Sequence, residues 1–110
     1  MTESEPGPED LKIITLARSA RARVGAAEGA AVRDETGRTY AASAVSLPSL
    51  RLSALQAAVA AAVSSGSDRL EAAALVTLSD ELADDDRKVL ADLAVATVLS
   101  AAPDGTVRRP

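Results

Sequence analysis

The sequence predicts one α/β domain in which helices cover a mixed β-sheet. Two strand-like segments separated by a Gly-containing turn predict an antiparallel hairpin. A later apolar run, Leu70–Leu78, has the composition of a strand that is buried on both faces, and such strands are usually parallel. Helical and strand patterns then alternate, as in βαβ crossovers. With 110 residues, 47% of them hydrophobic, the chain can bury the core of one ordinary domain.

The chain is expected to begin with a disordered tail and a helix. Residues 1–7 are acidic and rich in Pro and Gly, a composition that favours disorder. Pro8 suits the first position of a helix, and Gly25 stops that helix. Three arginines lie near the helix end, where we interpret them as compensating the helix dipole on a solvated face rather than as an anion site. They are Arg18, Arg21 and Arg23.

The predicted hairpin and its connection to the next helix follow. The strand candidates are Glu28–Asp34 and Arg38–Val45, and Gly37 supplies the positive φ that the turn between them needs. Residues 46–51, which include Pro48, are expected to form a connector.

The central helix is expected to begin at Ser53 and to end at Gly66. Ser53 and Gln56 fit a capping box, and only Ala and Val follow until Ser64. Gly66 stands where a left-handed C-cap favours glycine. Because this helix has no polar face along its middle, we expect other elements or a partner subunit to cover it on most sides.

The last third of the chain predicts a strand, a helix and a further strand. After the apolar run, Ser79 and Asp80 can cap a helix that continues to about Ala94. The next strand candidate is Val95–Ser100. The domain is therefore expected to span residues 8–102, followed by a turn-like C-terminal tail over residues 103–110.

Composition argues against several classes of function. The net charge of −4 and the single aromatic residue, Tyr40, disfavour nucleic-acid binding. We find no apolar run long enough to span a membrane and no signal peptide, so we expect a cytoplasmic protein without a membrane partner. The sequence contains neither Cys nor His, which removes the commonest zinc ligands, the thiol nucleophile and the usual neutral-pH base.

Three segments resemble the cytidine deaminase family. The family's hairpin is similar to residues 28–40, EGAAVRDETGRTY. Its Leu-Thr-x-Cys-Ala-Glu segment with the apolar helix that follows is similar to residues 50–66, LRLSALQAAVAAAVSSG. Its Cys-Arg-Gln-x-Leu-x-Glu-Phe stretch is similar to residues 86–93, DRKVLADL. The likeness covers roughly Leu11 to Leu99 and implies a three-layer cytidine deaminase-like sandwich.

The same resemblance implies that other residues replace the zinc ligands and the catalytic Glu of the family. In the family, a Cys or His at the start of the central helix and two later Cys hold zinc, and a Glu moves protons while zinc-bound hydroxide attacks the base. Here Ser53 stands at the first ligand position and Leu55 at the Glu position. The later ligand positions fall on Ala83 and Asp86, and residues 40–45 lack the acidic residue that the family offers to the ribose. We therefore expect zinc and the catalytic residues to be lost.

The remaining acidic residues, serines and glycines favour structural roles. An acidic run could hold a hard cation such as Mg²⁺ or Ca²⁺, but it suits the first turns of a helix better and lacks the spacing of an EF-hand. It comprises Asp80, Glu81, Asp84, Asp85 and Asp86. No His is present to activate a serine, and the glycines lack the spacing of a phosphate loop.

The preferred hypothesis is a non-catalytic cytidine deaminase-like protein, without a cofactor, that acts through self-assembly or an unidentified protein partner. Because central helices of the family meet near subunit interfaces, the resemblance implies a homodimer or homotetramer through the 53–65 helix. Two alternatives stay open. One is a zinc-dependent cytidine or nucleoside deaminase whose ligands include Asp80, Asp84 or Asp86, and the other is a vestigial cleft that binds a nucleoside without converting it.

Overall fold

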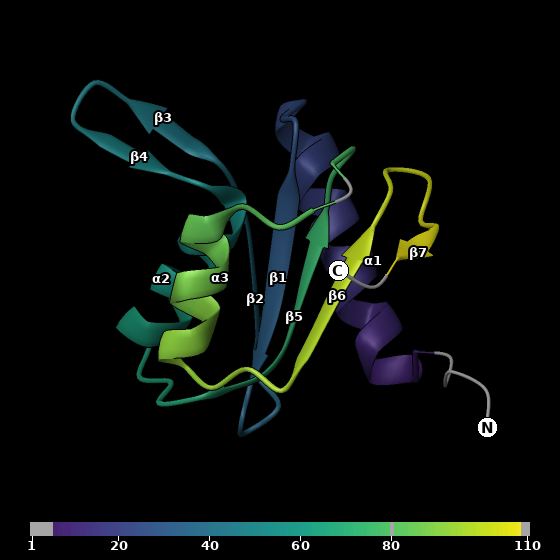
Figure 1. The fold of residues 1–110 in the computed structure, drawn as a ribbon, viewed down its shortest axis with the longest axis vertical. Helices are drawn as coiled ribbons and strands as arrows, with labels where there is room; N and C mark the ends of the chain where they lie inside the picture. Colours follow the sequence, from purple (N-terminus) through teal and green to yellow (C-terminus); the bar gives the residue numbers. More distant parts are fainter. Residues whose placement is uncertain (1–5, 80, 109–110) are drawn as a thin grey trace.

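A mixed sheet forms the middle layer of a three-layer sandwich (Figure 1). The computed structural model describes residues 6–79 and 81–108. Helix α1 (Pro8–Val24) covers one face of the sheet, and helices α2 (Ala54–Ser64) and α3 (Asp84–Asp92) cover the other. The five strands lie in the order β2-β1-β5-β6-β7. Their bounds are β1 Gly29–Asp34, β2 Thr39–Ser43, β5 Leu70–Val76, β6 Thr97–Ala101 and β7 Val107–Arg108.

Strand pairing confirms the predicted hairpin and the predicted mixed sheet. β1 pairs antiparallel with β2, and Gly37 in the turn between them has a φ of 91°. β1 also pairs antiparallel with β5, whereas β5 pairs parallel with β6 through the crossover that contains α3. β5 ends at Val76, two residues before the apolar run does, because Leu78 is exposed beyond the sheet.

Small side chains fill the core on both faces of the sheet. Along β1, Ala30 and Val32 face α2, while Ala31 faces α1, as the alternation of a strand requires. The predicted central helix is confirmed as α2, and five of its residues are buried: Ala54, Leu55, Ala58, Val59 and Ala62. Ala60 and Val63 remain exposed on its outer side, so the monomer covers this helix only in part.

The predicted connector over residues 46–51 is wrong, because this segment forms a second hairpin. Strands β3 (Val45–Leu47) and β4 (Leu50–Leu52) pair antiparallel as a separate two-stranded sheet. Pro48 and Ser49 form the tight turn, at which the fixed φ of proline is compatible with chain reversal. This arm, residues 45–52, projects away from the sandwich (Figure 1).

The third helix is shorter than predicted at both ends. Ser79 does not cap it, because the Ser79 hydroxyl accepts from the Glu81 amide at 3.3 Å and donates to the Glu81 carbonyl at 3.0 Å in a local turn. The other predicted cap, Asp80, lies outside the described residues. α3 starts at Asp84, behind an N-cap residue without a side-chain hydrogen bond, and ends at Asp92. Ala94 then adopts a left-handed φ of 53° that turns the chain toward β6.

The C-terminal segment contributes to the sheet, which the sequence pattern did not indicate. Asp104 and Gly105 form the expected turn, and Val107–Arg108 then pairs antiparallel with β6 as β7. A two-residue strand is too short to show a period-two pattern. The predicted disordered tail over residues 1–7 lies mostly outside the described residues.

Asp34, at the end of β1, ties the hairpin turn to the chain before β5. Its side chain is only 2% exposed. One carboxylate oxygen accepts from the Ser67 hydroxyl at 2.6 Å, and the other accepts from the Thr36 amide and hydroxyl and the Arg38 amide. These bonds, the Ser67 bond foremost, lower the pKa of Asp34 from 3.8 to about 2 despite its burial.

This low pKa predicts a specific loss of stability in acid. A carboxyl group whose pKa is lower in the folded state stabilises the fold above its unfolded pKa. Its contribution is therefore expected to disappear as the pH falls from about 4 to about 2. The replacement Asp34→Asn should flatten the dependence of the unfolding midpoint on pH in this range, measured by circular dichroism. Asp85→Asn, at an exposed carboxylate, is the control, and an equal flattening in both variants would argue against this role of Asp34.

Candidate functional site

The N-termini of α2 and α3 meet beside the sheet, and Ser53 lies at the junction. The Ser53 hydroxyl accepts from the Gln56 amide at 3.0 Å, and the Gln56 side chain accepts from the Ser53 amide at 2.9 Å. The predicted capping box is therefore confirmed. It satisfies two amides that the first turn of a helix otherwise leaves without intrahelical partners.

Ser53 also contacts Asp86, which comes from the first turn of α3. The Ser53 hydroxyl donates to a carboxylate oxygen of Asp86 at 2.6 Å, the short distance typical of a hydrogen bond to a charged acceptor. Asp86 is only 3% exposed, and its position in the first turn of α3 suits a negative charge. Two residues that are 33 positions apart in the sequence thus link the starts of two helices.

The other two candidate site residues bring no polar group to this junction. Leu55 is 1% exposed and belongs to the core between α2 and the sheet, where it packs among buried aliphatic residues. Ala83 is exposed at the N-cap of α3 and offers only a methyl group. The structure therefore brings Ser53 and Asp86 together, buries Leu55 and leaves Ala83 at the rim.

The comparisons with known proteins identify the family to which the chain belongs. A family model described as cytidine deaminase-like matches residues 6–105, so the chain belongs to the cytidine deaminase-like family. No curated protein matches the sequence significantly.

Solved structures of cytidine deaminases share this fold over most of their length. The enzyme from Burkholderia pseudomallei is similar with a TM-score of 0.76 and 24% identity, over 90% of this chain and 89% of that one. The enzyme from Mycobacterium tuberculosis is similar with a TM-score of 0.67 and 29% identity, over 89% of this chain and 87% of that one. The enzyme from Mycobacterium leprae is similar with a TM-score of 0.62 and 22% identity, over 89% of this chain and 90% of that one.

The other acidic residues that were considered as cation ligands do not form one cluster among the described residues. Asp84 and Asp85 are exposed on α3, whereas Asp86 is buried, and Asp80 lies outside the described residues. Among residues 6–79 and 81–108, His, Cys, Asp and Glu side chains form no group of three or more that could hold a metal ion. In the same ranges, no helix is both long and apolar enough to cross a membrane.

An unpredicted polar cluster lies where β5 ends. The buried Thr77 donates its hydroxyl proton to the Glu28 carboxylate at 2.7 Å, and the Thr77 carbonyl accepts from the Arg108 guanidinium at 2.7 Å. These bonds join the loop after β5 to the start of β1 and to β7. No local sequence signal could have found the cluster, because its three residues come from distant parts of the chain.

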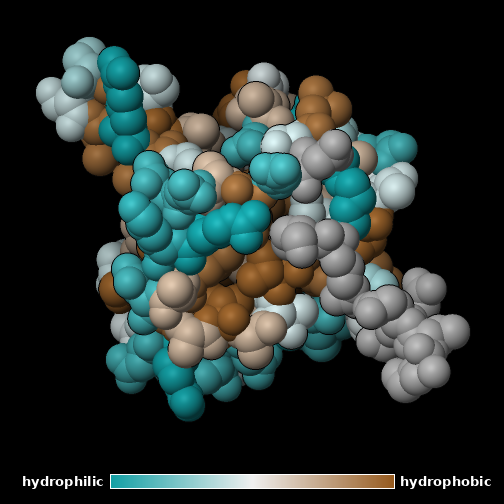
Figure 2. All heavy atoms as spheres, viewed as in Figure 1, coloured by the Kyte–Doolittle hydropathy of each residue, from teal (hydrophilic) through white to brown (hydrophobic). Residues whose placement is uncertain are grey.

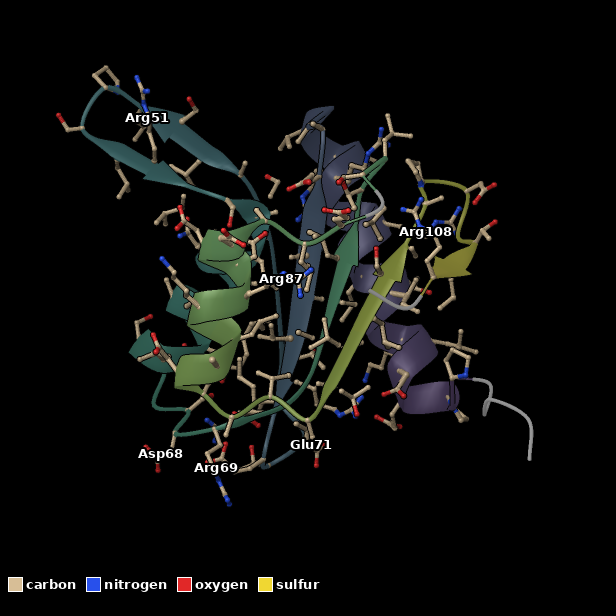
Figure 3. The ribbon with its side chains drawn as sticks, in the orientation of Figure 1. Arg51, Asp68, Arg69, Glu71, Arg87 and Arg108 are labelled. Carbon is tan, nitrogen blue, oxygen red and sulfur yellow. The ribbon has the colours of Figure 1, made fainter. Side chains whose placement is uncertain are left out.

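A hollow between α3 and β6 exposes apolar side chains. Figure 2 shows apolar residues gathered in this hollow, beside the polar outer face of α3. Its cavity has a volume of about 360 Å³. Arg87 reaches over the sheet at the edge of the hollow (Figure 3). The aliphatic residues that line the cavity are Leu82, Leu90, Ala91, Ala94, Val95 and Val98.

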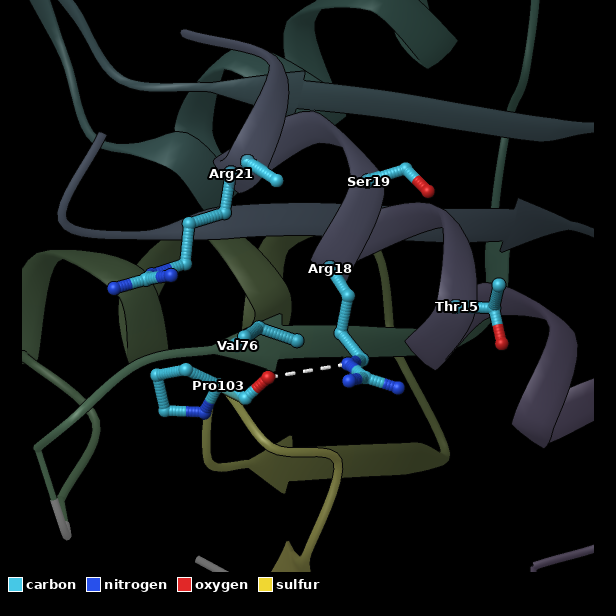
Figure 4. Close-up of a pocket in the computed structure, with 7 residues that line it drawn as sticks. Thr15, Arg18, Ser19, Arg21, Val76 and Pro103 are labelled. Carbon is cyan, nitrogen blue, oxygen red and sulfur yellow. Dashed lines mark hydrogen bonds between the residues drawn. The ribbon is translucent and has the colours of Figure 1, made fainter. Parts of the chain in front are cut away.

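A second cavity, of about 280 Å³, lies on the α1 side between α1 and Pro103. Arg18 donates to the Pro103 carbonyl at 3.2 Å, and Arg21 donates to the Ala27 carbonyl at 3.2 Å. The two guanidinium groups point in different directions (Figure 4). This arrangement supports the interpretation of these arginines as helix-end and surface residues rather than as an anion site.

Replacing Ser53 by alanine is expected to lower stability by about 2 kcal/mol. The change removes the N-cap of α2 and takes away a donor from the buried Asp86 carboxylate, and each effect costs about 1 kcal/mol. Urea unfolding would measure the loss. Ser64→Ala is the matched control, because the Ser64 hydroxyl donates to the Ala61 carbonyl on the exposed end of the same helix. If both variants lost the same small amount, the bond between Ser53 and Asp86 would have no special role.

Proposed function

We propose that this chain is a non-catalytic member of the cytidine deaminase-like family that acts by self-assembly. The observation that supports the loss of catalysis is the direct bond between Ser53 and Asp86, next to a core that contains Leu55. The resemblance assigns two zinc-ligand positions to Ser53 and Asp86 and the proton-carrying position to Leu55.

The groups at this junction do not fit a catalytic zinc. Such a site needs about three protein ligands, normally imidazole, thiolate or carboxylate, whereas the junction offers one neutral hydroxyl and one carboxylate. Two oxygen ligands of a tetrahedral zinc would lie roughly 3.3 Å apart, given Zn–O bonds of about 2 Å. The Ser53 and Asp86 oxygens lie 2.6 Å apart, because the Ser53 hydroxyl donates a hydrogen bond to the Asp86 carboxylate. Leu55 has no group that could carry a proton.

Nucleoside binding is not favoured over assembly. Tyr40, the only aromatic residue in the sequence, is partly buried against the core between the sheet and α2. Its ring is thus engaged in packing rather than free to stack on a base.

The outer side of α2 supports self-assembly. This helix contains no charged residue, and Ala60 and Val63 are exposed on it. Such small side chains let a second helix approach to the usual interaxial distance of about 8–10 Å. We expect α2 of one copy to pack against α2 of another, which buries the part of this helix that the monomer leaves uncovered.

Light scattering after size exclusion tests this assembly. The wild-type chain at micromolar concentration is expected to have at least twice the monomer mass of 11.2 kDa. Ala60→Asp, which places a charge on the outer side of α2, should reduce the mass to that of a monomer. Leu11→Asp is the control, because Leu11 is exposed on α1 on the opposite side of the sheet. A wild-type monomer would contradict the proposal.

A further inference from the structure

Strand β2 forms one edge of the main sheet, and its outer side is open in the described part of the chain. β2 stands first in the order β2-β1-β5-β6-β7, and β1 is its only described neighbour. The Asp34 amide donates to the Arg38 carbonyl at 2.9 Å, which fixes the alternation of the ladder. Tyr40 and Ala42 therefore direct their backbone groups toward β1. The N–H and C=O groups that point outward belong to Thr39, Ala41 and Ser43.

This edge has none of the features that usually prevent edge strands from pairing. Natural sheet edges are protected by charged side chains, proline, bulges or very short strands. β2 contains neither a charged residue nor proline, and its register with β1 runs without a shift from Thr39 to Ser43. The arm over residues 45–52 forms a separate sheet, so it does not pair with this edge. The outward N–H and C=O groups call for an extended backbone as their partner.

A second copy of β2 matches this edge in antiparallel orientation. With a two-fold axis at Ala41, the outward N–H groups of each copy face the outward C=O groups of the other. Ala41 then lies opposite its own copy and Thr39 lies opposite Ser43, so no like charges face each other. On the side of α2, Tyr40 of one copy is paired with the small Ala42 of the other, which leaves room for the ring.

The position of α2 over the sheet agrees with the same two-fold axis. α2 packs over β2 and β1, and α3 lies on its β6 side, so no described helix covers its side toward the β2 edge (Figure 1). Because strands are spaced about 4.8 Å apart, a helix centred between β1 and β2 lies about 5 Å from an axis at the outer edge of β2. The two α2 helices are thus placed about 10 Å apart, a distance at which helices pack.

We propose that two copies of this chain pair along β2, so that their sheets form one continuous sheet with both α2 helices side by side on one face. This inference rests on the proposed self-assembly through α2 and adds the strand contact that orients the two copies. Hydrogen bonds between the strands set a register, which the small apolar side chains of α2 do not define by themselves.

Disulfide formation between copies tests this register, because the sequence contains no cysteine. Ala41→Cys places the thiol at the axis, where opposed residues of a hydrogen-bonded pair lie about 5.5 Å apart, within the range of a disulfide. Thr39→Cys is the matched control on the same edge, because the two copies of residue 39 are then about 14 Å apart, four positions along the strand. Under mild oxidation, we expect Ala41→Cys to form a linked dimer at least ten times faster than Thr39→Cys. Equal rates in the two variants would overturn the inference.

A charge on the same edge separates this inference from the proposed assembly. Ala41→Lys, at an exposed residue, sets two ammonium groups against each other across the axis and should raise the dissociation constant at least tenfold. Leu11→Lys on α1, on the other face of the sheet, should change it little. Circular dichroism checks that both variants fold. If Ala41→Lys assembled like the wild type while Ala60→Asp dissociated, the strand contact would be refuted and assembly through α2 would stand. A monomeric wild type would refute both.

Discussion

Gly29→Ala is expected to destabilise the fold by about 3 kcal/mol or more, the upper range for overpacking a core. Gly29 starts β1 against the C-terminal half of α1. A Cβ atom placed there would lie 2.1 Å from the Ala17 carbonyl oxygen and 2.7 Å from the Arg21 amide nitrogen. Both are helix backbone atoms, which cannot move aside as a side-chain end can. The helix and the strand would have to separate, and this would open the core around Ile13 and Ala17.

Thermal unfolding measured by circular dichroism would show this effect as a fall in midpoint of roughly 10 °C or more. Gly7→Ala is the matched control, because a Cβ atom at Gly7 meets nothing within 4 Å and its φ of −73° suits any residue. A Gly29→Ala variant with the stability of the wild type would show that α1 does not approach the sheet as closely as described.

Leu55→Glu has the second large expected effect, because it returns a carboxylate to the position that carries the proton-transferring Glu in the family. Leu55 is 1% exposed inside an aliphatic core. An unpaired charge at such a site costs about 3–5 kcal/mol. Burial should also raise the pKa of the new carboxyl group above its unfolded value of about 4.3.

The pH dependence distinguishes charge burial from loss of packing. A carboxyl group whose pKa is raised in the folded state destabilises the fold increasingly as the pH rises above its unfolded pKa. The free energy of unfolding of Leu55→Glu, measured in urea, should therefore fall between pH 4 and pH 8 relative to Leu55→Gln, which has the same shape without the charge. If the two variants had the same stability throughout this range, the site around residue 55 would be solvated, as in a working catalytic cleft.

Local signals were sufficient to predict most of the fold. The capping box at Ser53, the positive φ at Gly37 and the apolar run from Leu70 each depend on a few neighbouring residues, and all three predictions were confirmed. The arm was missed because each of its strands has only three residues, which is too short for a period-two pattern to show.

The candidate site was only partly predictable. The resemblance identified Ser53 and Asp86 as replaced ligand positions, but their hydrogen bond depends on how α2 and α3 are placed by the sheet. The start of α3 was mispredicted because Ser79, a good cap residue in isolation, bonds to Glu81 in a turn instead. The hollow between α3 and β6 likewise depends on tertiary structure, since residues of several segments line it.

The proposed function interprets these residues as family site positions that have taken structural roles in a cytidine deaminase-like fold. Ser53 caps a helix, Asp86 anchors that cap to a second helix and Leu55 completes the core. A variant that combines Ser53→Cys, Ala83→Cys and Asp86→Cys would restore three thiolates at the family's ligand positions, and it provides the zinc-binding positive control for the wild type.

The zinc content of the wild-type protein, purified from zinc-supplemented medium and dialysed, tests the central claim most directly. Elemental analysis is expected to find far less than one zinc per chain, while the triple-cysteine variant retains zinc. One zinc per wild-type chain that survives dialysis, together with ammonia release from cytidine, would contradict the account.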